Sequence, residues 1–237
     1  MKTIFHAADD RGHANHGWLD THHSFSFAGF YNPERTNFGA LRVLNDDIVA
    51  ASKGFGSHPH DNMEIITIPL TGELEHKDNM GNQSVIKSGD VQVMSAGTGV
   101  YHSEYNPSEA DEVNLLQIWV FPNKKNVTPR YQQITLGKQT HNELHQILSP
   151  SSDDDGVWIH QNAWFHLGRI DQGHSVDYSL KDSQNNGVYT MILEGEVEIN
   201  DQKLGTKDAI GIWEAADFEV TAKTDARILL IEVPLKF

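Results

Sequence analysis

Short runs in which apolar and polar residues alternate recur along almost the whole chain, and this feature constrains the fold most strongly. The runs cover residues 40–43, 64–70, 85–86, 91–94, 115–120, 189–193, 197–199 and 228–233. Turn-forming residues such as Gly72, Gly89 and Gly195 separate them. A period of two is typical of strands, and turns at this frequency are typical of sandwiches and barrels. The sequence therefore predicts an all-β fold, with residues 142–147 as the best candidate for a short helix.

A weak internal repeat predicts two similar β domains in tandem. Residues 70–75 and 89–94 are echoed, in the same order, by residues 193–198 and 207–212. Pro122, Pro129 and the polar residues between them interrupt the apolar pattern, as expected of a domain boundary. The predicted domains are residues 1–130 and residues 140–237.

Composition excludes several classes of function. The chain has no cysteine, so any bound metal must be held by imidazole nitrogen and oxygen. A net charge of −15 argues against nucleic-acid binding, which depends on Lys and Arg, and is better explained by solubility and mutual repulsion of monomers. No apolar run approaches the roughly 20 residues that a membrane span requires, and the N-terminus does not resemble a signal peptide. We therefore expect a cytoplasmic monomer with no nucleic-acid or membrane partner.

The chain has 14 histidines, and three of them belong to two closely spaced pairs of potential metal ligands. His58 and His60 are two residues apart, which places both imidazoles on one face of a strand, and Glu64 follows on that face. His102 and Glu104 repeat the spacing with an imidazole and a carboxylate. Opposed across a small barrel, the pairs would converge on one divalent ion, for which Fe, Mn, Ni, Cu and Zn are all suitable.

The segments around these pairs resemble the two motifs of the cupin family and, within it, the pirins. The pirin-like segments are GFGSHPH at residues 54–60, LEHKD at 74–78, GDVQVMSAG at 89–97 and HSE at 102–104, with further likeness at 25–27 and 41–46. The chain departs from the usual cupin pattern in having Ser95 where proline is common and two extra residues before His102. The likeness is greatest for bacterial members described as quercetin 2,3-dioxygenases.

The resemblance implies a fold of two tandem cupin (jelly-roll) β-barrels, with one divalent metal in the N-terminal barrel alone. It implies that His58, His60, His102 and Glu104 hold the metal, whereas Glu64 supports the strand or the ligands. The implied activity is cleavage of a flavonol such as quercetin by O2. A carboxylate near the metal can take the proton of the substrate hydroxyl, so we expect Glu104 also to act as general base. No histidine follows His174, so we expect the second barrel to bind no metal, and the remaining histidines to be structural or on the surface.

Two other functions compete with this interpretation. Some pirins are described as cofactors of transcription, so the chain could be a non-catalytic, metal-containing regulator that acts through protein partners. Alternatively, the same metal could serve another cupin reaction, such as isomerisation, decarboxylation or hydrolysis, on a different enolisable chelator. Steady O2 uptake with quercetin distinguishes the dioxygenase from both.

Overall fold

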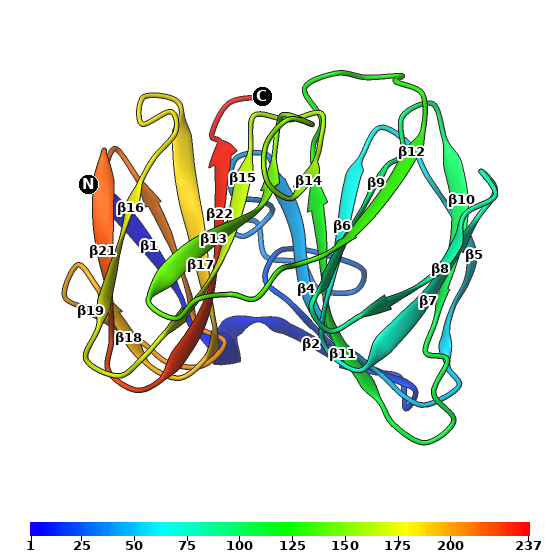
Figure 1. The fold of residues 1–237 in the computed structure, drawn as a ribbon, viewed down its shortest axis with the longest axis horizontal. Helices are drawn as coiled ribbons and strands as arrows, with labels where there is room; N and C mark the ends of the chain where they lie inside the picture. The colour runs from blue at the N-terminus through cyan, green and yellow to red at the C-terminus, as the bar shows by residue number, and fades with distance from the viewer.

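The computed structural model describes residues 1–237 and consists almost entirely of strands (Figure 1). Four sheets are present, two of seven strands and two of four, and the one helical element is the 3-10 turn η1 (Ala8–Asp10). The predicted all-β class is therefore confirmed. The predicted helix over residues 142–147 is wrong, because β13 (Glu143–Ser149) pairs along its length with β15 (Trp164–Ile170). No helical segment has the length and hydropathy needed to cross a membrane.

The first barrel is formed by one seven-stranded and one four-stranded sheet. In spatial order the larger sheet contains β12 (Arg130–Thr135), β9 (Asp90–Ser95), β6 (Glu64–Thr71), β11 (Val113–Val120), β4 (Leu41–Val49), β3 (Leu19–His23) and β2 (Gly12–Asn15). The smaller sheet contains β5 (Gly54–His60), β10 (Val100–Tyr105), β7 (Glu73–Asp78) and β8 (Gln83–Lys87). All pairings within these sheets are antiparallel.

The second barrel repeats the arrangement of the first. Its larger sheet contains β1 (Lys2–His6), β20 (Ala209–Trp213), β17 (Asn186–Glu194), β22 (Ala226–Pro234), β15, β13 and β14 (Val157–Trp158). Its smaller sheet contains β16 (Ser175–Ser179), β21 (Asp217–Ala222), β18 (Val197–Ile199) and β19 (Gln202–Leu204). The strand order of the two barrels corresponds, except that β14 is parallel to β13 whereas β2 is antiparallel to β3. This correspondence confirms the tandem repeat that the sequence predicts.

The predicted division into residues 1–130 and 140–237 stays a prediction, and two strands depart from it. β1 pairs with β20, so the first strand of the chain belongs to a sheet of the second barrel. β12 begins at the predicted boundary and pairs with β9 of the first barrel. The N-terminal segment therefore ties the two barrels together.

The largest apolar core lies between the two seven-stranded sheets, which face each other in the middle of the molecule (Figure 1). It contains 27 buried residues from both barrels, including Leu116 and Ile118 of β11 and Leu229 and Ile231 of β22. Alternate residues of the same strands point the other way, into the barrels. In β11 these are Val113, Leu115, Gln117 and Trp119, so two of the four positions are polar or amphipathic.

Candidate metal centre

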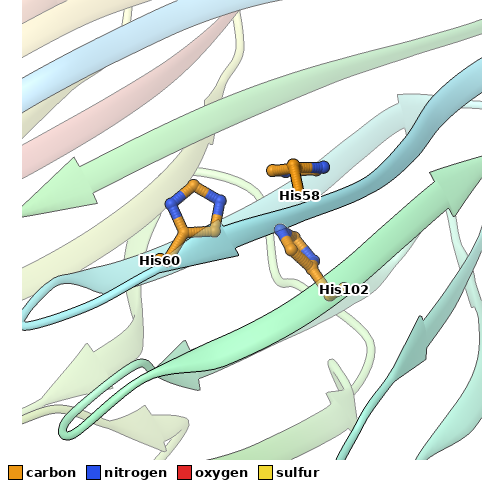
Figure 2. A group of neighbouring side chains, drawn as sticks. All are labelled: His58, His60 and His102. Atoms are coloured by element: carbon orange, nitrogen blue, oxygen red, sulfur yellow. The ribbon is translucent and has the colours of Figure 1, made fainter.

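Strands β5 and β10 bring three imidazoles together inside the first barrel (Figure 2). His58 and His60 share a face of β5, and Pro59 between them is tolerated because β5 is an edge strand. His102 lies directly opposite His58 in the antiparallel register. The ring centroids are 4.3 Å apart for His58 and His102 and 4.9 Å apart for both other pairs. One nitrogen of each ring lies within 4.8 Å of the others, a spacing that one ion could bridge.

Glu104 lies on β10, as His102 does, and follows an irregularity in the β5–β10 register. Its carboxylate accepts hydrogen bonds from Gln117 Nε2 at 3.2 and 3.3 Å and from Thr67 Oγ1 at 3.4 Å. Its oxygens group with nitrogens of His102 and His76 rather than with all three imidazoles. Burial raises the pKa of Glu104, against the opposing influence of the nearby imidazoles. Thus His102 is shared by two groups of potential ligands.

The three imidazoles have free ring nitrogens and two of them have lowered pKa values, and both features favour metal binding. Nε2 of His102 is buried and has no hydrogen-bond partner, a state that costs free energy unless a ligand satisfies it. Nδ1 of His58 lies 2.8 Å from the carbonyl oxygen of Gly56, so this nitrogen carries the proton and Nε2 is left free. Burial, reinforced by neighbouring histidines, lowers the pKa of His60 to about 4 and that of His102 to about 2. Neutral imidazole is the form that binds metals.

His76, a histidine expected to be structural, supports His102 together with Asp78. His76 is fully buried on β7, with Nε2 3.1 Å from Asp78 Oδ2 and Nδ1 3.5 Å from Nδ1 of His102. A proton on His76 Nε2 would leave its Nδ1 to accept from His102, which frees His102 Nε2. The signal that could have revealed this pair is again the i, i+2 spacing of His76 and Asp78, on a strand adjacent to β10.

A cavity of about 410 Å³ opens beside these residues. His58, His60 and Glu104 line one part of it, and aromatic side chains form much of the remainder, namely Trp18, Phe27, Phe55 and Trp119. A second cavity of about 560 Å³ adjoins the first and shares Phe27, Asn45, Asp47 and Phe55 with it. Neither cavity is lined by Lys or Arg. The space therefore suits a flat, uncharged aromatic molecule better than an anion.

Glu64 belongs to none of the groups of potential ligands. It is buried at the start of β6 and accepts a hydrogen bond of 2.7 Å from Ser95 Oγ, and burial raises its pKa to about 7. A further group, which the sequence did not indicate, lies at the surface on the β2–β3 hairpin and consists of His13, Asp20 and His22. There His13 Nε2 is already 2.9 Å from Asp20 Oδ1.

Comparison with known proteins places these features in a family. The family model named Pirin matches residues 5–120, and a model described as the quercetinase C-terminal cupin domain matches residues 146–233. A quercetin 2,3-dioxygenase of Escherichia coli K12 is 41% identical over 227 residues, covering 96% of each chain. A pirin-like protein of Caulobacter vibrioides is 38% identical, covering 94% of this chain and 96% of its own.

Solved structures agree with the fold. The E. coli bacterial pirin YhhW in complex with nickel(II) superimposes with a TM-score of 0.92 at 39% identity, covering 98% of this chain and 99% of its own. Another crystal structure of YhhW gives a TM-score of 0.93. The predicted fold of two tandem cupin barrels is thereby confirmed.

Proposed function

The chain belongs to the pirin family, and on that premise we propose that it is a metal-dependent dioxygenase that cleaves flavonols such as quercetin with O2. The observation that carries the proposal is the orphaned Nε2 of His102, whose ring lies close to those of His58 and His60 beside an aromatic-lined cavity. The quercetin 2,3-dioxygenase of E. coli, 41% identical over almost the full length, supports the same reaction.

We propose His58, His60, His102 and Glu104 as the ligands of one divalent ion. Three imidazoles and a carboxylate suit Fe, Mn, Ni, Cu and Zn, and the nickel(II) complex of YhhW is consistent with this range. When bound, the ion would act as a Lewis acid toward the 3-hydroxyl and 4-carbonyl oxygens of a flavonol. The chain's own residues then determine where the substrate lies and where its proton goes.

Glu104 is the proposed general base. Its carboxylate is buried beside His76 and His102 and lines the same cavity as His58 and His60, where it would meet a substrate hydroxyl group. Gln117 and Thr67 donate to Glu104 and keep its oxygens oriented before and after they take the proton. Deprotonation gives an electron-rich enolate, the form of the substrate that reacts with O2.

The aromatic walls have a separate role. Trp119 lies edge-on to His60 with centroids 4.9 Å apart, and Phe55 lies edge-on to Trp18 at 5.2 Å. A planar polyphenol between such faces buries apolar area and displaces water from the reacting carbons. The cavity of about 410 Å³ falls within the size range of small-molecule sites.

Oxygen uptake is the direct test. Protein loaded in turn with each candidate metal is mixed with quercetin, and O2 consumption and loss of flavonol absorbance are followed together. We expect O2 and quercetin to disappear in equal amounts with at least one metal. No consumption with any metal would favour the non-catalytic regulator, and conversion without O2 would favour another cupin reaction.

A further inference from the structure

A row of polar side chains crosses the inner face of the larger sheet of the first barrel. His23 pairs with Asn45, Asn45 with Gln117, and Gln117 with Thr67, so four neighbouring strands each contribute one polar residue. Residues directly opposite one another in a sheet point to the same face. Because Gln117 lines the cavity, the whole row faces the interior of the barrel.

The two halves of this row differ in their hydrogen bonds. Gln117 and Thr67 both donate to Glu104, so their role lies within the proposed metal centre, although Gln117 Oε1 is itself buried without a partner. Asn45 and His23 lie beyond it, and both are almost fully buried, with 3% of each residue exposed. Asn45 Oδ1 and His23 Nδ1 nonetheless have no hydrogen-bond partner. Such orphaned atoms are uncommon in proteins, because each costs free energy.

The neighbours of Asn45 place it at the junction of the two cavities. Asn45 and Asp47 are two residues apart on β4 and line both cavities. Asp47 is held by a short hydrogen bond from Thr21 Oγ1. Phe27 lies edge-on to His23 with centroids 5.2 Å apart, and also to Trp119 at 5.4 Å. A ligand that extends from the imidazoles into the second cavity must therefore pass Asn45.

We propose that Asn45 and His23, with Asp47 beside them, form a subsite that hydrogen-bonds hydroxyl groups on the part of an aromatic substrate that lies away from the imidazoles. This inference rests on the proposed function and specifies its substrate class as a polyphenol hydroxylated beyond its chelating oxygens. Asn45 Oδ1 needs a donor, which a phenolic hydroxyl provides. A ligand with a carboxylate would instead meet the carboxyl group of Asp47. Neither cavity is lined by a Lys or Arg that could balance the negative charge of such a ligand.

If Asn45 serves binding, its orphaned amide should lower the stability of the free protein. Asn45→Leu replaces the orphaned amide with an apolar side chain of similar size, so we expect the thermal midpoint to stay constant or rise. Thr190→Val is a matched control, because Thr190 Oγ1 is also buried without a partner but lies in β17 of the second barrel. It should affect the thermal midpoint in the same direction and leave binding unchanged.

The test compares two flavonols that carry the same chelating oxygens. Nickel-loaded protein is titrated anaerobically with quercetin and with 3-hydroxyflavone, and binding is followed by quenching of tryptophan fluorescence, since Trp18 and Trp119 line the cavity. Asn45→Leu should weaken quercetin binding about tenfold, the upper range for loss of one hydrogen bond, and change 3-hydroxyflavone binding less than about twofold. His23→Phe should shift the same ratio and serves if the first variant does not fold.

Each other outcome overturns the subsite in a recognisable way. If Asn45→Leu weakens both flavonols equally, Asn45 shapes the cavity without recognising hydroxyl groups. If the variant instead loses thermal stability while Thr190→Val does not, Asn45 has a structural role. If wild-type protein binds neither flavonol, the proposed function fails and the subsite fails with it. If wild-type protein binds both tightly and the variants do not change the ratio of the two affinities, the subsite alone is refuted.

Discussion

The two barrels share one strand order and differ in what fills them. In the smaller sheet of the first barrel, β5 and β10 present His58, His60, His102 and Glu104 to the interior. The corresponding strands of the second barrel, β16 and β21, present Val176, Tyr178, Phe218 and Val220, which belong to a cluster of 16 buried apolar residues. The same scaffold therefore encloses a cavity in one copy and a packed core in the other.

Buried polar groups provide a second comparison of the two barrels. Glu232 of the second barrel is satisfied by the chain itself, through Tyr178 Oη at 2.7 Å, Asn186 Nδ2 at 2.7 Å and two backbone amides. Buried atoms with no partner occur in both barrels, on Asn45 and His102 of the first and on Thr190 and His166 of the second, but of these residues Asn45 alone lines the aromatic-lined cavity. Polar groups that a chain satisfies internally contribute to its structure, whereas polar groups left open around a cavity are available to a ligand.

The largest expected effect is loss of the metal from the first barrel alone. His102→Ala removes the imidazole shared by both ligand groups, so we expect metal affinity to fall by more than the roughly 10–100-fold typical of losing an outer hydrogen-bond partner. Elemental analysis after gel filtration measures this. His166→Ala, which removes a buried imidazole of the second barrel, should retain the metal of wild-type protein. Equal metal content in the two variants would refute the contrast between the barrels.

Glu104→Gln should have the next largest effect, on the reaction rather than on metal content. General-base catalysis typically contributes about 10²–10⁴-fold, so the metal-loaded variant should lose quercetin turnover on that scale. The amide retains an oxygen that can still ligate and is nearly the same size, so the fold should persist. The comparison is valid for protein with metal content matched to wild type. Full turnover in such protein would exclude Glu104 as the base while leaving it as a ligand.

Most of the difference between the two barrels could be predicted from the sequence, because the strand pattern and the ligand spacing are both local features. The alternation of short runs predicts strands, and the spacing of His58 with His60 and of His102 with Glu104 places each pair on one face. The expected assignment of all four as ligands stays a prediction, as do the metal-free second barrel, the monomeric state and the cytoplasmic location.

What could not be predicted depends on contacts between distant segments. β1 pairs with β20 through residues such as Lys2 and Trp213, and no local pattern reveals so remote a partner. Residues 143–147 form a strand because β15 offers them a hydrogen-bonding edge, a tertiary effect that overrides local preference. The roles of His76 and Asn45 follow from register across strands, which the sequence does not specify.

A smaller effect is expected from His76, which supports His102 from the neighbouring strand β7. His76→Phe retains a ring that can pack against Tyr131, whose centroid lies 4.7 Å from that of His76, but removes both nitrogens. Without the partner at its Nδ1, His102 loses the contact that fixes its tautomer, so metal affinity should fall about 10–100-fold. Competition with a chelator of known affinity measures this. Unchanged affinity would show that His76 only packs, and His76→Gln, which can still accept a hydrogen bond, should restore part of any loss.

The smallest effect concerns how each barrel's stability depends on pH. Burial raises the pKa of Glu64 from 4.5 to about 7, so folding favours the protonated carboxyl. Its contribution is fully present below about pH 4.5 and is lost as pH rises through about 7. In Glu64→Gln this dependence disappears, so the decrease in unfolding free energy between about pH 5 and about pH 8 should be smaller than in wild type by on the order of 2 kcal/mol.

Urea denaturation at both pH values measures the effect, and Glu232→Gln provides the contrast from the second barrel. In Glu232→Gln, an NH2 group takes the place of an oxygen that accepts hydrogen bonds in the wild-type protein. Two donors then face each other, so this variant should lose stability at both pH values. If Glu64→Gln gave the same uniform loss, Glu64 would be ionised and paired with Arg130 in the folded protein. The carboxylates of the two barrels would then be equally satisfied, and the distinction between them would be confined to the residues around the cavity.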